Sequence, residues 1–277
     1  YSLSKKTFGI GFFWITNGLL KKLFLADYIA VNFIDRVFSN PGSFSGFENM
    51  MALFGYSLQV YADFSGYTDI AIGTALWLGF QLPKNFNSPY KASSVAEFWK
   101  RWHISLSTWL KDYLYIPMGG NRSGSLFSNI MIGVILLFLS LLAADWWITL
   151  FFISLVGACY LIARVSPTFK DWISTNVNLM LTMLIGGLWH GASWNCVVWG
   201  GLNGLGLVVY NLGGEVRPRE KSTAWYVRPW RVLITPVFIT FTRRCFRSDS
   251  WESASVMLDR IVYHAEPQVI VDVLAGA

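Results

Sequence analysis

Residues 97–122 read EFWKRWHISLSTWLKDYLYIPMGGNR, and this stretch decides how the rest of the chain is interpreted. It combines three tryptophans with one histidine and several fixed charges, and apolar regions lie on both sides of it. If the stretch is one helix, four of its side chains share a face: Phe98, Trp102, Ser105 and Trp109. An aromatic, basic and amphipathic helix of this kind is typical of a membrane–water interface.

The beginning and the end of this helix also carry signals. Glu97 and Arg101 have the spacing of an i,i+4 ion pair. Pro117 predicts that the helix ends nearby, and Gly119-Gly120-Asn121 predicts the turn that follows it.

The composition of all 277 residues is that of a membrane protein. Hydrophobic residues make up 54% and charged residues 14%, whereas soluble domains carry about 25% charged residues. The mean hydropathy is +0.43. The net charge is +6, and the Lys and Arg residues lie in short clusters between apolar spans. Clusters of this kind set the topology of a membrane protein, and their distribution argues against nucleic-acid binding. We therefore expect an all-α, polytopic integral membrane protein with a single membrane domain over residues 1–277.

Apolar runs predict the membrane segments. We expect one long helix or an interfacial pair over 8–20 and 23–38, and two helices within 47–80 that break near Ser65-Gly66. We also expect a transmembrane hairpin formed by 126–144 and 146–163. Further apolar segments are expected at 177–188, 196–212 and 230–241. A basic loop is expected at 213–229, and the unassigned tail 248–277 is expected to contribute at most a surface helix. The basic residues between 84 and 122 predict that this part faces the cytoplasm.

Small residues predict one close helix–helix contact. Gly187 and Gly191 are four residues apart, and so are Gly200 and Gly204. This small-xxx-small spacing permits close packing of two helices in a bilayer.

Two carboxylates lie in the middle of the apolar region 47–80. Asp63 and Asp69 would be costly at membrane depth, so they predict a polar cavity or a partner. The alternative is that both cap backbone groups at the expected helix break.

The chain has three histidines, and two of them lie in its least ordinary segments. His103 belongs to the opening stretch, and His190 lies in the apolar, glycine-rich run 184–195, LIGGLWHGASWN. A buried imidazole there would be neutral and able to accept a proton, which makes His190 a candidate general base. The structural alternatives are a packed His190 and a solvated, interfacial His103. His264 lies in the mixed tail and is expected at the surface.

Several other kinds of site have no support in the sequence. The chain has no G-x-S-x-G elbow and no Walker A motif. Cys159, Cys196 and Cys245 are far apart, so we expect buried free thiols, no metal site and no bound cofactor.

Two motifs in the opening stretch carry a family resemblance. Residues 98–107, FWKRWHISLS, and 113–122, YLYIPMGGNR, resemble the membrane-bound O-acyltransferase (MBOAT) family in its bacterial polysaccharide O-acetyltransferase branch, which includes alginate O-acetylation proteins. Residues 20–27, LKKLFLAD, 63–69, DFSGYTD, and 187–195, GLWHGASWN, resemble the same branch in the same order. The chain does not begin with Met, and the family pattern implies further helices before Tyr1.

The resemblance implies a fold and residue roles. The family fold is a ring of tilted transmembrane helices, some broken or interfacial, around a central funnel. His190 would be the catalytic histidine and His103 the second functional histidine. The matching motifs imply these substrate-binding residues: Trp102, Trp189, Asn195, Asp63, Asp69 and Asn121.

The chemistry implied is acetyl transfer from a cytoplasmic thioester, expected to be acetyl-CoA, to a hydroxyl on the far side of a bacterial inner membrane. His190 would take the hydroxyl proton, and His103 would orient the donor or stabilise the oxyanion. Lys100 and Arg101 would attract the donor's phosphates or only set topology. The acceptor would be an extracytoplasmic partner protein, a hydroxyl relay or the polysaccharide itself.

Two other functions remain open from the sequence. Within the family, the runner-up is D-alanyl transfer toward teichoic acid. Outside it, the alternative is a non-enzymatic channel or transporter with a polar midline at Asp63, Asp69 and His190.

Overall fold

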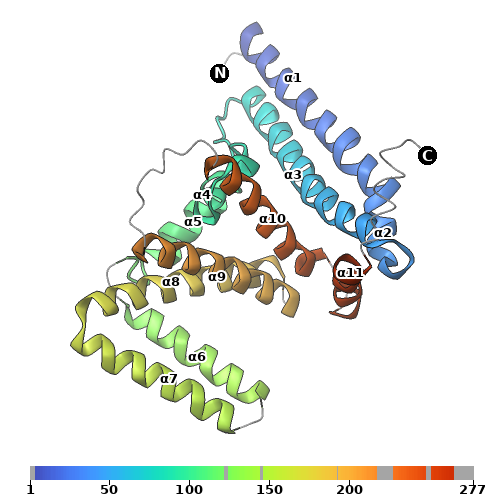
Figure 1. The fold of residues 1–277 in the computed structure, drawn as a ribbon. Coiled ribbons are helices and arrows are strands. Elements are labelled where there is room, and N and C mark those ends of the chain that lie inside the picture. Colours follow the sequence, from blue (N-terminus) through green and yellow to red (C-terminus); the bar gives the residue numbers. More distant parts are fainter. Residues whose placement is uncertain are drawn as a thin grey trace. The chain divides into compact units, whose positions relative to one another are not determined.

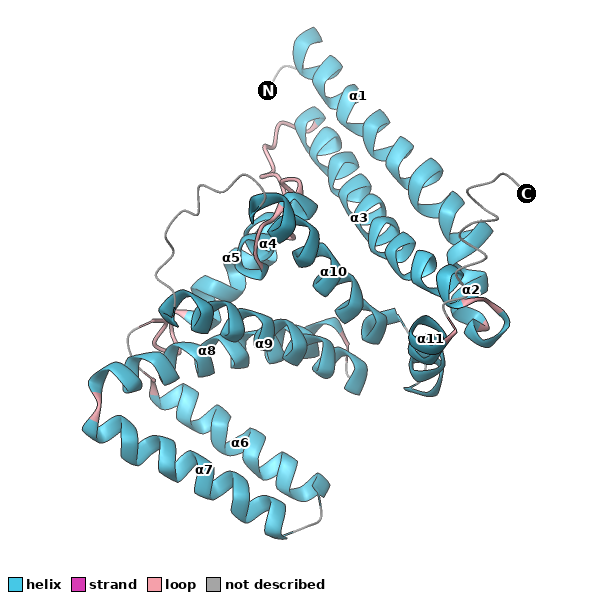
Figure 2. Cartoon of the chain, in the orientation of Figure 1, coloured by secondary structure: helices cyan, strands magenta, loops and turns pink. Residues whose placement is uncertain are grey.

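The computed structural model describes residues 4–121, 124–143, 146–191, 193–216, 227–247 and 251–264. Within these ranges every regular element is helical, as expected (Figure 2). The α-helices are α1 Lys5–Leu20, α2 Asp35–Ser39, α3 Gly46–Trp77, α4 Val95–Arg101, α5 Ile104–Leu110, α6 Leu126–Ala143, α7 Trp146–Val165, α8 Pro167–His190, α9 Trp194–Val216, α10 Val227–Arg247 and α11 Trp251–Tyr263 (Figure 1).

The chain divides into two compact units. The first contains the described parts of residues 1–93, 97–104 and 229–277, and the second those of 94–96 and 105–228.

In the first unit, α1 and α3 lie side by side and antiparallel (Figure 1). A Cβ atom on Gly18 would lie 2.5 Å from the carbonyl oxygen of Gly66, and one on Gly73 would lie 2.5 Å from that of Gly11. Glycine is therefore required at these positions, because the two backbones leave no room for a side chain.

The long N-terminal helix is confirmed. Helical backbone continues from α1 to α2 through two π-helical segments, Lys21–Asp27 and Ala30–Ile34, so residues 5–39 form one helical run.

The expected break near Ser65-Gly66 is wrong, because α3 is one helix of 32 residues. It begins with a capping box, in which Ser45 and Glu48 satisfy each other's backbone N–H groups. Gly66 does not interrupt the helix but faces the backbone of α1. Gly66 is therefore needed for close packing of two helices. Sequence alone does not distinguish a glycine of this kind from one that breaks a helix.

The core of the first unit includes the C-terminal segment. Its buried cluster is Ile34, Val37, Phe38, Ala52, Leu53, Tyr56 and Met257. Met257 of α11 is only 1% exposed, and a Cβ on Gly46 would lie 2.3 Å from the carbonyl oxygen of Arg260. α11 is therefore packed onto α3, and its role is larger than that of the surface helix expected there.

The second unit confirms the predicted glycine contact. A Cβ on Gly187 would lie 2.4 Å from the carbonyl oxygen of Cys196, and one on Gly200 would lie 2.4 Å from that of Met183. α8 and α9 are therefore antiparallel neighbours in close backbone contact. The predicted hairpin is present as a pair of helices, α6 and α7, which pack against each other. That this pair spans the membrane stays a prediction, and residues 144 and 145 between the helices lie outside the described residues.

Among the described residues, one helix is long and apolar enough to cross a membrane, Trp194–Gly213 of α9. Two shorter apolar helical segments cover 126–137 and 149–165.

Candidate functional site

The opening stretch is not one helix. α4 ends at Arg101 and α5 begins at Ile104, and His103 between them has a left-handed backbone with φ of 45°. A non-glycine residue in this conformation costs about 1–3 kcal/mol, so the surrounding structure must stabilise it. The single aromatic face expected from Phe98 to Trp109 is therefore wrong, because the helix axis is interrupted after Trp102.

Contacts from a preceding loop stabilise this interruption. The Ile104 N–H donates to the Asn85 carbonyl at 3.0 Å, and the Asn87 N–H donates to the Arg101 carbonyl at 2.9 Å. The His103 ring nitrogen Nδ1 lies 3.3 Å from Oδ1 of Asn85. The loop thus binds the backbone on both sides of His103 and orients its ring.

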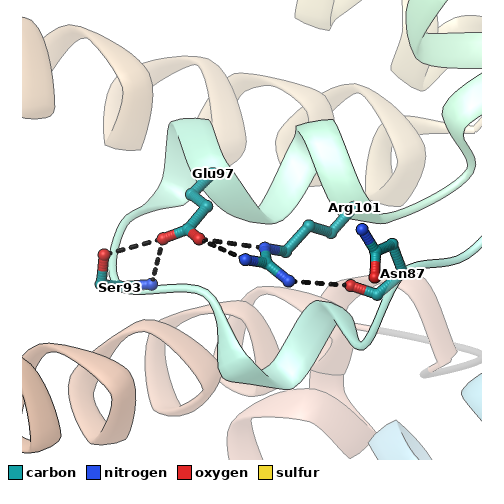
Figure 3. Close-up of polar contacts among 4 residues, drawn as sticks. All are labelled: Asn87, Ser93, Glu97 and Arg101. Carbon is teal, nitrogen blue, oxygen red and sulfur yellow. Dashed lines mark hydrogen bonds and ion pairs between the residues drawn. The ribbon is translucent and has the colours of Figure 1, made fainter.

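The predicted Glu97–Arg101 ion pair is confirmed and belongs to a larger network (Figure 3). The Nη2 and Nε atoms of Arg101 donate to Oε1 of Glu97 at 2.7 and 3.0 Å, and its Nη1 donates to the Asn87 carbonyl at 3.1 Å. The Ser93 N–H and hydroxyl donate to the other carboxylate oxygen at 2.8 and 2.7 Å. The Ser93 N–H, ahead of its hydroxyl and Arg101, lowers the pKa of Glu97 below its ordinary value.

Trp102 lies in an aromatic cluster and is only 7% exposed. Its ring stacks on Phe98 with centroids 5.6 Å apart and meets the edge of Phe86 at 5.0 Å. Phe64 of α3 contacts the edge of the His103 ring at 4.7 Å. Neighbouring residues 102 and 103 are therefore both held by aromatic rings.

Arg243 of α10 completes this cluster and was not predicted. Its guanidinium carbon lies 4.2 Å from the centroid of Trp102, and its Nη1 donates to Oγ of Ser57 at 2.7 Å. The side chain is only 5% exposed. The sequence reads Arg243-Arg244 as a basic end to an apolar segment, but spacing of four places Arg243 on the same helix face as Thr235 and Ile239, which are also buried.

The two predicted substrate carboxylates form ion pairs within the first unit. Lys21 Nζ lies 2.7 Å from Oδ2 of Asp69, and Lys22 Nζ lies 2.5 Å from Oδ1 of Asp63. Neither carboxylate caps a helix break, because α3 is continuous at both positions. The expectation of a partner is confirmed; the substrate-binding role of both residues stays a prediction.

His190 is the last residue of α8 in the second unit, and Gly191 follows in an extended conformation. Its ring lies 4.9 Å from the centroid of Trp189 and 5.1 Å from that of Trp199, at nearly perpendicular angles. The His190 side chain is exposed and not buried within the unit, contrary to the expectation, because the helix ends there.

The remaining predicted residues are distributed around the second unit. Trp189 is 61% exposed, Asn195 is half-buried in the first turn of α9, and Asn121 accepts a hydrogen bond from the Tyr115 hydroxyl. His103 belongs to the first unit and His190 to the second. Within the described ranges, no group of three His, Cys, Asp or Glu side chains is placed to hold a metal ion.

Comparison with known proteins gives a consistent picture. Residues 2–156 match the model of the membrane-bound O-acyltransferase family. The chain is 36% identical over 260 residues to a peptidoglycan O-acetyltransferase of Helicobacter pylori, an alignment that covers 94% of this chain. It is 38% identical over 237 residues to a protein of Azotobacter vinelandii named "Probable alginate O-acetylase AlgI", covering 86% of this chain.

A more distant similarity also exists. The chain is 25% identical over 203 residues to a teichoic acid D-alanyltransferase of Bacillus subtilis, covering 72% of this chain and 39% of that protein. The chain spans only 40% of the Helicobacter protein and 37% of the Azotobacter protein. His103 lies inside the family match, and His190 lies beyond it but within the 260 residues similar to the Helicobacter protein.

Proposed function

Because this chain belongs to the membrane-bound O-acyltransferase family, we propose that its full-length protein transfers an acetyl group from a thioester donor to a hydroxyl acceptor, for O-acetylation of a cell-surface or exported polysaccharide. Two relatives at 36% and 38% identity carry names that describe O-acetylation. The chain covers less than half of each of these relatives, so the activity is proposed for the whole protein.

The observation that carries the proposal is the placement of His190. Its imidazole is exposed at the end of α8, and two indole rings contact it from adjacent helices. These edge contacts restrict the orientation of the ring. In the proposed reaction, His190 accepts the proton of the acceptor hydroxyl while the hydroxyl oxygen attacks the thioester carbonyl, and the thiolate of the donor leaves.

The proposed role of His103 is to orient the donor or to stabilise the oxyanion that forms at the carbonyl. The Asn85 side chain and the edge contact with Phe64 support this role, since both restrict the ring. Lys100 is placed one residue from the Glu97–Arg101 network and is the basic residue of this segment that we assign to the donor's phosphates.

The finer structural expectations belong to the same proposal. The full-length protein would form a ring of tilted helices around a funnel in a bacterial inner membrane. The donor would bind from the cytoplasm, and the acceptor would be an extracytoplasmic relay protein or the polysaccharide. The membrane-bound character of the family and the apolar helix at Trp194–Gly213 support this location.

The two other functions have weaker support. D-alanyl transfer rests on a relative with 25% identity. A channel or transporter needs a polar midline available to a solute, but Asp63 and Asp69 are each occupied by a lysine. We therefore rank acetyl transfer above both.

The test uses the full-length protein in sealed membrane vesicles. Vesicles receive either acetyl-CoA labelled in the acetyl group or a labelled D-alanyl thioester, and label on protein and glycan is counted. We expect label only from acetyl-CoA. Label from the D-alanyl donor would support the runner-up, and no label from either donor with native partners present would contradict an acyltransferase.

A further inference from the structure

We infer that Arg243 is a positioning residue for His103, acting through Trp102; this inference rests on the proposed function. Arg243 lies on α10, well beyond the residues that match the family model. Its side chain reaches the segment that carries His103, as its contact with Trp102 shows.

The environment of Arg243 is unusual for a charged residue. The guanidinium is 95% buried, and none of the ion pairs formed by the described residues includes it. Its hydrogen bonds go to neutral oxygens: the Ser57 carbonyl at 3.2 Å, the Ser57 hydroxyl at 2.7 Å and the Tyr90 hydroxyl. A buried charge without a carboxylate is costly, so these contacts have to compensate for the lost hydration.

These contacts join three segments that are distant in sequence. Ser57 belongs to α3, Tyr90 belongs to the short helical turn Pro89–Lys91, and Trp102 directly follows α4. The Tyr90 hydroxyl itself donates to the Ser57 carbonyl at 2.6 Å, so the acceptors are already bound to each other. Arg243 in turn joins Ser57 and Tyr90 to Trp102, because its guanidinium lies over the Trp102 ring.

The consequence for His103 follows from the backbone. Trp102 is the residue before His103, whose φ of 45° is disfavoured for any side chain. The Arg243 guanidinium carbon lies 4.2 Å from the centroid of Trp102 and 5.8 Å from that of the stacked Phe98, so cation and rings form one cluster that restrains the residue before His103. The left-handed turn then directs His103 toward Asn85 and Phe64. Loss of the Arg243 contact removes one restraint on Trp102, beside its contacts with Phe98 and Phe86, and through it loosens the His103 ring.

The experiment compares Arg243→Gln, Arg243→Lys and the matched control Arg244→Gln in the full-length protein. Arg244 is the next residue on α10, and it donates to the Ala254 carbonyl at 2.8 Å. We expect Arg243→Gln to lower kcat per folded molecule about 100-fold, as displaced catalytic groups do, with the donor KM changed less than about threefold. Arg243→Lys should restore part of kcat, because it keeps a cation over Trp102. Arg244→Gln should have the wild-type kcat.

A double-mutant cycle tests the route through Trp102. If Arg243 acts through that ring, Trp102→Leu combined with Arg243→Gln should lower kcat no more than about threefold beyond the lower single variant. Strict additivity of the two effects, or a wild-type kcat in Arg243→Gln, would overturn the inference. A lower amount of folded protein with normal turnover would show a purely structural role and would also overturn it.

A second measurement separates this inference from the proposed function. Trypsin cleaves after Arg101 and Lys111, so residues 102–111 form one peptide that contains His103 and no other histidine. We expect diethylpyrocarbonate to modify His103 in this peptide at least about threefold faster in Arg243→Gln than in Arg244→Gln, because the ring is less protected by its contacts. Equal rates would contradict the inference. An inactive wild-type protein would contradict the proposed function, and the rates would still decide the role of Arg243.

Discussion

The ammonium group of Lys21 lies 2.7 Å from Oδ2 of Asp69, although 48 residues separate them in the chain. Only 9% of the Asp69 side chain is exposed, and Asn17 donates to the same oxygen at 2.7 Å. The neighbouring pair of Lys22 and Asp63 is much more open, with 41% and 47% exposure. The π-helical segment Lys21–Asp27 therefore pairs with one buried and one exposed carboxylate of α3.

This contrast predicts different costs for two adjacent substitutions. Lys21→Met leaves the buried Asp69 carboxylate without its cation and should lower the free energy of unfolding by about 3–5 kcal/mol. Lys22→Met breaks two exposed pairs, with Asp63 and with Asp27, and should lower it by less than about 1 kcal/mol for each pair. Denaturant unfolding of both variants in the same detergent measures the difference. Equal losses in the free energy of unfolding would contradict this account, because burial of Asp69 would then not increase the cost of removing its lysine.

The Glu97 network predicts a pH dependence. The pKa of Glu97 is lowered in the folded protein, so its stabilisation is complete above the ordinary value of 4.5 and is lost as pH falls through the folded value. Glu97→Gln removes this contribution. We expect the midpoints of thermal unfolding of wild type and Glu97→Gln to differ at pH 6 and to converge below the folded pKa. A constant difference across this range would contradict the assignment.

Tight backbone packing between α8 and α9 predicts a large effect from a single methyl group. Gly200→Ala places a Cβ 2.4 Å from the Met183 carbonyl oxygen, whereas the nearest atom to a Cβ on Gly201 is a flexible Leu184 methyl at 3.5 Å. We expect Gly200→Ala to destabilise the protein by about 1–3 kcal/mol. Gly201→Ala should change stability by less than about 0.5 kcal/mol. The same unfolding assay checks both, and an equally small effect at Gly200 would be inconsistent with this helix contact.

The left-handed backbone at His103 allows two substitutions to separate the effect on stability from the effect on activity. Asn adopts this conformation more readily than most residues, so His103→Asn should keep the wild-type unfolding midpoint. Val is β-branched and should cost about 1–3 kcal/mol at the same position. Both variants should lose transfer activity, since neither has an imidazole. A fully active His103→Asn would remove His103 from the proposed site.

Local spacing predicted several contacts correctly. The i,i+4 rule identified the Glu97–Arg101 pair, and the spacing of Gly187 and Gly200 with their partners identified the α8–α9 contact. The ion pair was predictable because Glu97 and Arg101 lie on one short helix. The glycine contact was predictable because it requires only that the small-residue faces of two helices meet.

Contacts between distant segments were not predictable in the same way. The helix break at His103 depends on Asn85, 18 residues earlier, and periodicity alone predicts a continuous helix. Gly66 was interpreted as a break because its true neighbour, Gly18, lies on another helix. Arg243 was interpreted as a topology signal, because nothing near it in sequence shows that Ser57, Tyr90 and Trp102 surround it.

The central claim, acyl transfer with His190 as the general base, is tested most directly by one comparison of histidine variants. His190→Gln and the control His264→Gln are prepared as full-length proteins at equal folded amounts, and label transfer from acetyl-CoA to the acceptor is measured. His264 is a suitable control because its side chain is 50% exposed and its Nε2 lies 3.6 Å from Oδ2 of Asp259, an exposed residue of its own helical segment. We expect His190→Gln to lower the transfer rate about 100- to 10,000-fold, the range for loss of a general base, and His264→Gln to keep the wild-type rate. A wild-type rate in His190→Gln would contradict the account.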